Sequence, residues 1–309
     1  MADTLAFVGT GTMGGPMAAR LLGAGHDVRV HDAVAAATAP LVAAGATAWP
    51  SAAGAAAGAR VAMLSLPGPA EVEAVVTGPD GVLAADPLPR VVVDLSTNAV
   101  PMVRRLRERC GAVGVVFIDA PVSGGVAKAR DGTLTVMVGA EPDELDDVRE
   151  VLGAIGSDLF HVGPSGSGAI AKLVNNQLFL AAAVLVQETY LVAGALGMEP
   201  SAVHRIVGAS SAAPYVKLAP LLLSRRFDDV VFRLDIAAKD VRLALASAEV
   251  EGVDVPLTRA ASEVYDTAVA AGDGALAFTA TLRELERRAG IELPPLRRQP
   301  PGPAGEGPR

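Results

Sequence analysis

The chain has 309 residues, of which 51% are hydrophobic and 19% are charged. This length favours two domains, because single hydrophobic cores stop growing at about 250–300 residues. The net charge of −8 argues against nucleic acid or an anionic membrane as a partner. Cys110 is the single cysteine, which excludes an internal disulfide and fits a reducing, cytoplasmic compartment.

A glycine-rich turn near the start of the chain is the first segment that indicates a ligand. The apolar residues 5–8 predict a strand, and a helical pattern that ends at Gly23 or Gly25 follows the turn. A strand, a GxGxxG turn and a helix in this order predict a dinucleotide-binding domain, with the cofactor phosphates on the helix N-terminus. The six cofactor-binding residues predicted here are Gly9, Thr10, Gly11, Thr12, Met13 and Gly14. The apolar run leads directly into this motif, so we expect no signal peptide.

Asp32 follows the second predicted strand, at residues 27–31. An acid at this position accepts hydrogen bonds from the adenosine ribose hydroxyls and repels a 2′-phosphate. Residues 33–35 contain no arginine that could bind such a phosphate. The sequence therefore favours NAD over NADP. The alternative is that Asp32 only caps the alanine-rich helix that follows.

Strands and helices continue to alternate up to residue 163. Further strands are predicted at 61–65, 91–94, 115–119, 133–138 and 158–162, and helices at 52–59, after Pro69, after Pro101 and at 142–152. Ligands of open α/β sheets lie beyond the carboxyl ends of the strands. Two loops at strand ends, residues 65–67 and 94–98, are therefore expected to border the cofactor through Leu66, Pro67 and Thr97. Ordinary turn chemistry explains each loop equally well.

Ser123, Gly124 and Gly125 follow the strand predicted at 115–119. A serine and two glycines at a strand end can expose consecutive backbone amides, which form a concave site for a carboxylate. A plain turn is the alternative.

A long apolar segment begins after the glycine- and serine-rich residues 163–168 and continues without proline to Gly197. It predicts one long buried helix that joins the two domains, with Ser167 as its cap. Lys172 and Asn176 share a face of this helix, with Asn175 beside them. Buried polar groups need partners, so these residues indicate a site, and they also argue against a membrane span. The alternative is a lysine that reaches solvent at a helix end.

Only helices are predicted after Gly197, with starts near Pro200, Pro214, Asp235 and Pro256. The predicted domains are residues 1–163 for the cofactor, an all-helical domain at 164–293 for substrate and dimerisation, and a disordered, proline-rich tail at 294–309. Charged residues such as Lys239 and Asp240 usually lie on a solvated helix face. Clusters with metal-ligand spacing are not found, so no metal is expected.

Four motifs follow one another along the chain: Phe7 to Met17, Asp119 to Gly125, Gly166 to Asn176, and Lys239-Asp240. In this order and spacing they resemble the β-hydroxyacid dehydrogenase family, which includes 3-hydroxyisobutyrate dehydrogenase and tartronate semialdehyde reductase. The resemblance implies a Rossmann-type α/β domain, a long interdomain helix and an all-α domain through which subunits pair into homodimers or homotetramers.

The resemblance also implies a role for each site residue. Lys172 would be the general acid/base, assisted by Asn176. Asn175 would bind substrate with Ser123, Gly124 and Gly125, which hold its carboxylate. Thr97 and Lys239 would lie against the cofactor. A free lysine has a pKa of about 10.4, which apolar neighbours and the positive nicotinamide would lower toward neutrality.

The predicted function is therefore the NAD-dependent interconversion of a small 3-hydroxy acid and its semialdehyde, with 3-hydroxyisobutyrate as the model substrate. A tartronate semialdehyde reductase is the first alternative. A non-catalytic nucleotide-binding scaffold is the second, and Lys172 argues against it, because a silent homologue has no physical reason to keep a buried lysine. An imine reductase is less favoured, since such enzymes usually carry Asp or Tyr in place of the lysine.

Overall fold

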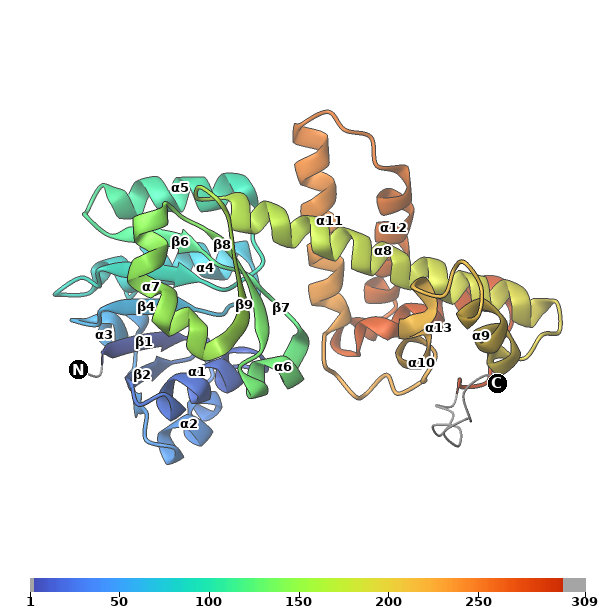
Figure 1. Cartoon of the computed structure of the whole chain (residues 1–309), viewed down its shortest axis with the longest axis horizontal. Coiled ribbons are helices and arrows are strands. Elements are labelled where there is room, and N and C mark those ends of the chain that lie inside the picture. The colour runs from blue at the N-terminus through green and yellow to red at the C-terminus, as the bar shows by residue number, and fades with distance from the viewer. Residues whose placement is uncertain (1–2, 297–309) are drawn as a thin grey trace, which may run out of the picture. The chain divides into compact units, whose positions relative to one another are not determined.

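The computed structural model describes residues 3–296 and divides into two compact units, Met1–Asn175 and Asn176–Arg309. The first unit is a doubly wound α/β domain and the second is helical (Figure 1). The predicted fold class is confirmed. The predicted division after residue 163 would place all of α8 (Ser167–Ala195) in the helical domain, whereas residue packing groups its first turns with the sheet.

The sheet of the first unit contains nine strands in the order β3-β2-β1-β4-β5-β6-β8-β7, and β9 pairs with β8. Strands β1 to β6 run parallel, and β8 is antiparallel to β6 and β7. The order 3-2-1-4-5-6 is that of dinucleotide-binding domains. The bounds are β1 Thr4–Val8, β2 Asp27–His31, β3 Thr47–Ala48, β4 Val61–Leu64, β5 Val91–Asp94, β6 Val116–Asp119, β7 Val122–Ser123, β8 Leu134–Gly139 and β9 Gly156–Gly163.

Helices cover both faces of this sheet, and each central strand contributes alternate residues to the two cores. In β1, Leu5 and Phe7 pack into one core with α1, α2, α6 and α7, whereas Ala6 and Val8 pack into the other with α3, α4 and α5. Burial on both faces explains why these strands are continuously apolar. The helices are α1 Gly14–Gly23, α2 Ala39–Ala43, α3 Ala52–Ala56, α4 Pro69–Thr77, α5 Val100–Gly111, α6 Gly125–Asp131 and α7 Pro142–Ile155.

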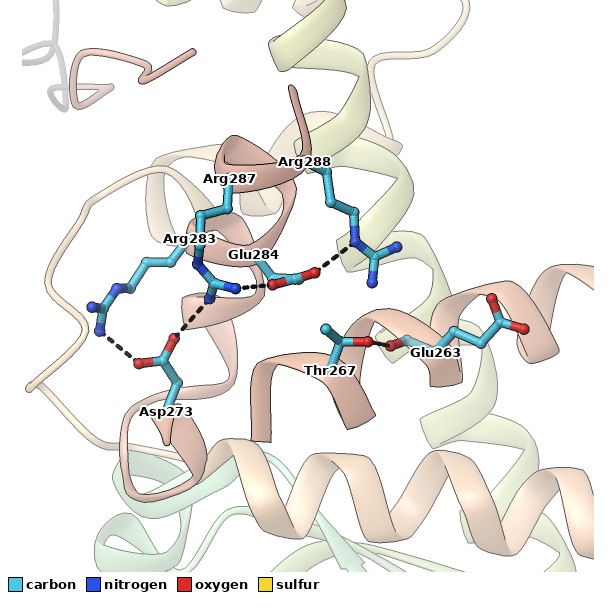
Figure 2. A network of polar contacts seen from close by, with 7 residues as sticks. All are labelled: Glu263, Thr267, Asp273, Arg283, Glu284, Arg287 and Arg288. Atoms are coloured by element: carbon cyan, nitrogen blue, oxygen red, sulfur yellow. Dashed lines mark hydrogen bonds and ion pairs between the residues drawn. The ribbon is translucent and has the colours of Figure 1, made fainter. Parts of the chain in front are cut away.

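The second unit is built on helices packed around Tyr190, Tyr265 and Phe278, each at most 2% exposed. After α8 come α9 Pro200–Gly208, α10 Ala219–Leu222, α11 Leu234–Val250, α12 Pro256–Ala270 and α13 Thr281–Ala289. Figure 2 shows the ion pairs of α13: Arg283 pairs with Asp273, outside the helix, at 2.7 Å, and buried Glu284 pairs with Arg287 and Arg288 within it. These pairs neutralise two acids that would be costly to bury alone.

Helix α8 differs from its prediction in two ways. Its burial is one-sided, because Leu178, Leu185 and Val192 are more than 60% exposed. Its start is also held differently: the N–H of Ala169, which a Ser167 cap could accept, donates instead to Asp119. A cap from a residue distant in sequence gives no local signal.

Among the described residues, α8 is the one helix long and apolar enough to cross a membrane. Its fully buried Gln187, however, donates to Thr279 O at 3.0 Å and accepts from Thr281 at 2.7 Å, within the helical unit. These partners show that α8 packs into the core of the helical unit at this position.

The predicted disordered tail, residues 294–309, lies outside the described residues from position 297 onward. Leu296 is described and differs from the prediction, since it is 5% exposed and its N–H donates to Leu223 O at 3.1 Å. A leucine in this proline-rich stretch supplies enough apolar surface to pack.

Candidate functional site

The glycine turn between β1 and α1 has the geometry that a dinucleotide requires. A Cβ on Gly9 would lie 2.3 Å from Ser65 O, and one on Gly14 would lie 1.9 Å from Gly9 O, so both positions exclude any side chain. A Cβ on Gly11, in contrast, would meet nothing within 4 Å, and Thr12 beside it is also exposed. The tip of the turn is therefore open at the start of α1, where a pyrophosphate could approach the backbone.

Asp32 lies beside this turn and orders it. Its Oδ2 accepts from the N–H of Thr10 at 2.7 Å and from the Thr10 hydroxyl at 3.3 Å, and its Oδ1 accepts from Val34 N at 2.8 Å. A carboxylate has about four lone-pair sites, and this one is only partly buried, so acceptor capacity is left for ribose hydroxyls. The bond from Val34 N is a local turn bond and not a helix cap, because the short helix that follows, Ala35–Thr38, begins after Val34 and has no side-chain cap. The bonds from Thr10 link the acid to the phosphate turn.

The two loops predicted to border the cofactor lie next to each other at the carboxyl ends of β4 and β5. Ser96 Oγ accepts from Leu66 N at 2.9 Å and thereby joins them. Asp94 holds the second loop by accepting from Ser96 N at 3.0 Å and from Asn98, on either side of Thr97. Burial raises the pKa of the Asp94 carboxyl from 3.8 to about 6, and its bonds to Ser96 oppose that rise. Sequence reasoning placed Asp94 and Ser96 in this loop but gave neither a role of its own, because strand-end polar residues are common in turns.

Ser123 ends β7, and the backbone reverses at Gly124 and Gly125, whose φ angles are +134° and +72°. Both glycines are exposed. A Cβ on Gly124 would also lie 2.5 Å from Cδ of Lys128, so a side chain there would be both strained and crowded. The turn therefore requires glycine and leaves its backbone accessible, as the predicted carboxylate site needs.

Lys172 lies in the second turn of α8 and extends to this same loop. Its Nζ donates to Val122 O at 2.7 Å, one residue before Ser123. Fifty residues separate the lysine from Val122 in sequence, and the fold brings them into contact. Lys172 is half-buried, so the alternative of a lysine tip extended into solvent does not describe it.

Asn176, one helical turn after Lys172, is 4% exposed and is held by a residue of α11. Its Nδ2 donates to Asp240 Oδ2 at 2.7 Å, and Asp240 Oδ1 pairs with Lys239 Nζ at 2.9 Å. Asp240 is 2% exposed, so the expectation of a solvated helix face is wrong at this position. The sequence signal was available, since Asp240 is an acid in a largely apolar stretch of α11. Asn175 precedes this group on α8 and is half-buried.

Two family models match the chain, one for each part. Residues 4–163 match the NAD binding domain of 6-phosphogluconate dehydrogenase. Residues 166–285 match the NAD-binding domain of NADP-dependent 3-hydroxyisobutyrate dehydrogenase. The chain belongs to the β-hydroxyacid dehydrogenase family. The predicted family resemblance is thus confirmed.

Relatives in this family align over nearly the full length. The 2-(hydroxymethyl)glutarate dehydrogenase of Eubacterium barkeri is 34% identical over 94% of this chain and 97% of its own. The 3-hydroxyisobutyrate dehydrogenase of Pseudomonas aeruginosa is 35% identical over 84% and 90%. The solved structure of Mycobacterium tuberculosis 3-hydroxyisobutyrate dehydrogenase with L-serine has a TM-score of 0.81 at 30% identity, covering 92% and 99%.

Family membership makes the chain an NAD(P)-dependent dehydrogenase or reductase that acts on CH–OH groups, as predicted. The expected reaction, interconversion of a hydroxy acid and its semialdehyde, is confirmed at that level. An imine reductase of Myxococcus stipitatus is only 18% identical, with a TM-score of 0.60, and shares the fold alone.

Proposed function

We propose that this protein oxidises acids of the form HOCH2–CHX–COO⁻ to their semialdehydes, and reduces those semialdehydes, with NAD as cofactor and Lys172 as general acid/base. 3-Hydroxyisobutyrate, in which X is methyl, is the substrate we favour. The acids named with the Eubacterium barkeri, Pseudomonas aeruginosa and Mycobacterium tuberculosis proteins described above share this frame. X is a carboxyethyl group in 2-(hydroxymethyl)glutarate and an amino group in L-serine. Tartronate semialdehyde reduction, in which X is hydroxyl, remains the alternative.

The contact between Lys172 and Val122 O carries this proposal, because it puts an ionisable amine next to the predicted carboxylate site. Bound NAD supplies the hydride acceptor. Nζ of Lys172 accepts the hydroxyl proton as the alcohol becomes a carbonyl, and in reduction its ammonium form donates that proton back. Asn176, fixed by Asp240, and Asn175 orient the substrate and the lysine.

Ser123 and the amides of Gly124 and Gly125 bind the carboxylate in this proposal. The support is their accessible backbone and the positive φ angles that keep it so. A group that recognises the carboxylate and a base that meets the alcohol are what a 3-hydroxy acid requires.

Asp32 gives the preference for NAD. Its carboxylate, already within 2.7 Å of Thr10 N, would repel the 2′-phosphate of NADP. Residues of the glycine turn, 9–14, would hold the pyrophosphate, and Leu66, Pro67 and Thr97 would border the cofactor. Lys239 as a cofactor contact stays a prediction, and its described partner is Asp240.

We also propose a cytoplasmic homodimer or homotetramer paired through the helical unit. Leu178, Leu185 and Val192 follow one another at seven-residue spacing on α8 and are 70%, 61% and 61% exposed. An apolar stripe of this kind on a long helix favours helix-to-helix association.

An initial-rate panel tests the substrate. Acids HOCH2–CHX–COO⁻ with X as methyl, hydroxyl, amino and carboxyethyl are compared by kcat/KM with NAD, and the semialdehydes with NADH. We expect the methyl compound to have the highest kcat/KM of the four. A higher kcat/KM for the hydroxyl compound would favour the tartronate semialdehyde alternative. If none of the four compounds were turned over, the proposed substrate class would be refuted.

A further inference from the structure

Asp119, the last residue of β6, is a buried carboxylate that the proposed chemistry does not use. It is 1% exposed, and burial raises the pKa of its carboxyl from 3.8 to about 6. Burying an ionisable group in the sheet core is costly unless it has several partners. Its partners all lie at the start of α8.

Both carboxylate oxygens of Asp119 accept hydrogen bonds from the start of α8, Oδ1 from the two residues just before Ser167 and Oδ2 from the first turn of the helix. Oδ1 accepts from Gly166 N at 2.7 Å and from the Ser165 hydroxyl at 3.3 Å, and Oδ2 accepts from Ala169 N at 2.9 Å. A carboxylate at a helix N-terminus satisfies amides that have no partner within the helix, and it interacts favourably with the helix dipole.

Two glycines make room for this contact. A Cβ on Gly139 would lie 2.6 Å from Oδ1 of Asp119, and a Cβ on Gly168 would lie 2.9 Å from Oδ2 and 2.6 Å from the backbone oxygen of Asp119. Each of these distances is shorter than the van der Waals contact that a Cβ atom makes with an oxygen. The helix start and the strand end therefore approach more closely than any residue with a side chain would allow.

The same short segment also holds the tip of Lys172. Asp119 bonds to Ala169, three residues before the lysine, and Val122, three residues after Asp119, accepts from Nζ at 2.7 Å. The segment itself is fixed on both sides, since Ala120 N donates to Asp94 O at 2.8 Å and Met137 N donates to Pro121 O at 3.0 Å. The helix backbone next to Lys172 and the end of its side chain are therefore both bound to one stretch of four residues, 119–122.

We propose that Asp119 is a positioning residue for the reaction: it holds the first turn of α8 on the end of β6 so that Lys172 meets the substrate at a fixed distance. The inference rests on the proposed role of Lys172. Asp119 acts in this proposal through the helix, by way of its hydrogen bonds with Ser165, Gly166 and Ala169.

Asp119→Asn tests this role. It keeps the size and shape of the side chain but replaces one acceptor oxygen by an NH2 group, which cannot accept from the backbone N–H of Gly166 or Ala169. Amide exchange at Gly166 and Ala169 should accelerate, while NADH affinity stays within twofold of wild type. The kcat should fall ~10- to 100-fold, the loss expected for a displacement of about 1 Å. The deuterium isotope effect on kcat, with substrate labelled at the alcohol carbon, should be at least as large as in wild type, because proton and hydride transfer have become slower. Asp147→Asn, which removes an exposed carboxylate of the same unit, is the matched control and should leave all four readouts unchanged.

Gly139→Ala is a second variant, which displaces the same carboxylate without changing its chemistry, and it should reproduce the kcat loss. Faster amide exchange with native kcat would overturn the proposal, and so would unchanged exchange in both variants. Failure of the proposed function looks different: wild-type enzyme would turn over no hydroxy acid, or Lys172→Ala would remain active.

Discussion

Replacing Lys172 by alanine separates the acid/base role of this side chain from its structural role. The structural cost follows from its contact with Val122 O, since Val122 is 8% exposed and its carbonyl loses a partner. Leaving a buried acceptor unpaired costs about 1–3 kcal/mol, against about 5–15 kcal/mol for the stability of a whole domain. Alanine is also the best helix former, so the variant should fold.

The catalytic cost should be larger. A positioned acid/base contributes ~10²–10⁴-fold in rate, which corresponds to about 3–5 kcal/mol of the activation barrier. We expect kcat to fall by that factor while NADH affinity is kept, because the glycine turn and Asp32 are untouched. Lys172→Arg should be almost as impaired, since a guanidinium remains charged and cannot accept the proton.

The assay is steady-state turnover of the hydroxy acid with NAD, together with NADH titration and urea unfolding. Lys217→Ala, at an exposed lysine of the helical unit, is the control and should match wild type. The ionisation in the oxidative pH–rate profile should disappear in Lys172→Ala, and a small primary amine added to the buffer should restore part of its rate. A Lys172→Ala enzyme with kcat within threefold of wild type would refute the reasoning.

Three further predictions concern the cofactor, the substrate and the buried acid of β5. Repulsion between Asp32 and the 2′-phosphate should give NAD at least a tenfold advantage in kcat/KM, for which about 1.4 kcal/mol suffices; equal use of NADP would show that Asp32 does not face the ribose. Gly124→Val should abolish turnover but leave NADH binding intact, and the methyl ester of the substrate should react poorly; an ester as good as the free acid would remove Ser123 to Gly125 from the site. Burial raises the pKa of Asp94 to about 6 in the folded state, so its contribution to stability falls as pH rises from about 4 to 6 and is constant above that. Urea unfolding of wild type and Asp94→Asn at pH 5 and pH 7 should therefore show wild type gaining about 1 kcal/mol on the variant at the lower pH, and an unchanged difference would contradict the raised pKa.

The fold of the cofactor-binding half of this protein could be predicted from its sequence alone. The strand at Thr4–Val8, the glycine turn, α1 and the strand ending before Asp32 follow one another within about thirty residues. Their signals are local: apolar strand residues, glycines at strained or crowded positions, and an acid after a strand. The two-residue strands β3 and β7 escaped prediction because they are too short to show any periodicity.

The sequence also identified Lys172 and Asn176 as unusual, because polar residues in a long apolar helix need an explanation. It did not identify what holds them. Lys172 contacts Val122 across 50 residues, Asn176 contacts Asp240 across 64, and Asp119 holds Ala169 across 50. The sequence marks some of these residues as unusual, but it does not show which of them pair, because the pairing depends on where the two elements come to lie.

The exposed face of α8 was likewise decided by tertiary structure. An apolar composition favours burial. When a helix is apolar on every side, however, its sequence does not show which side its neighbours will cover. Leu178, Leu185 and Val192 are as apolar as the buried Leu180, Val184 and Leu191 on the same helix. The local sequence of α8 was enough to predict a helix. Its buried side and the partners of its polar residues depend on how distant segments pack against it.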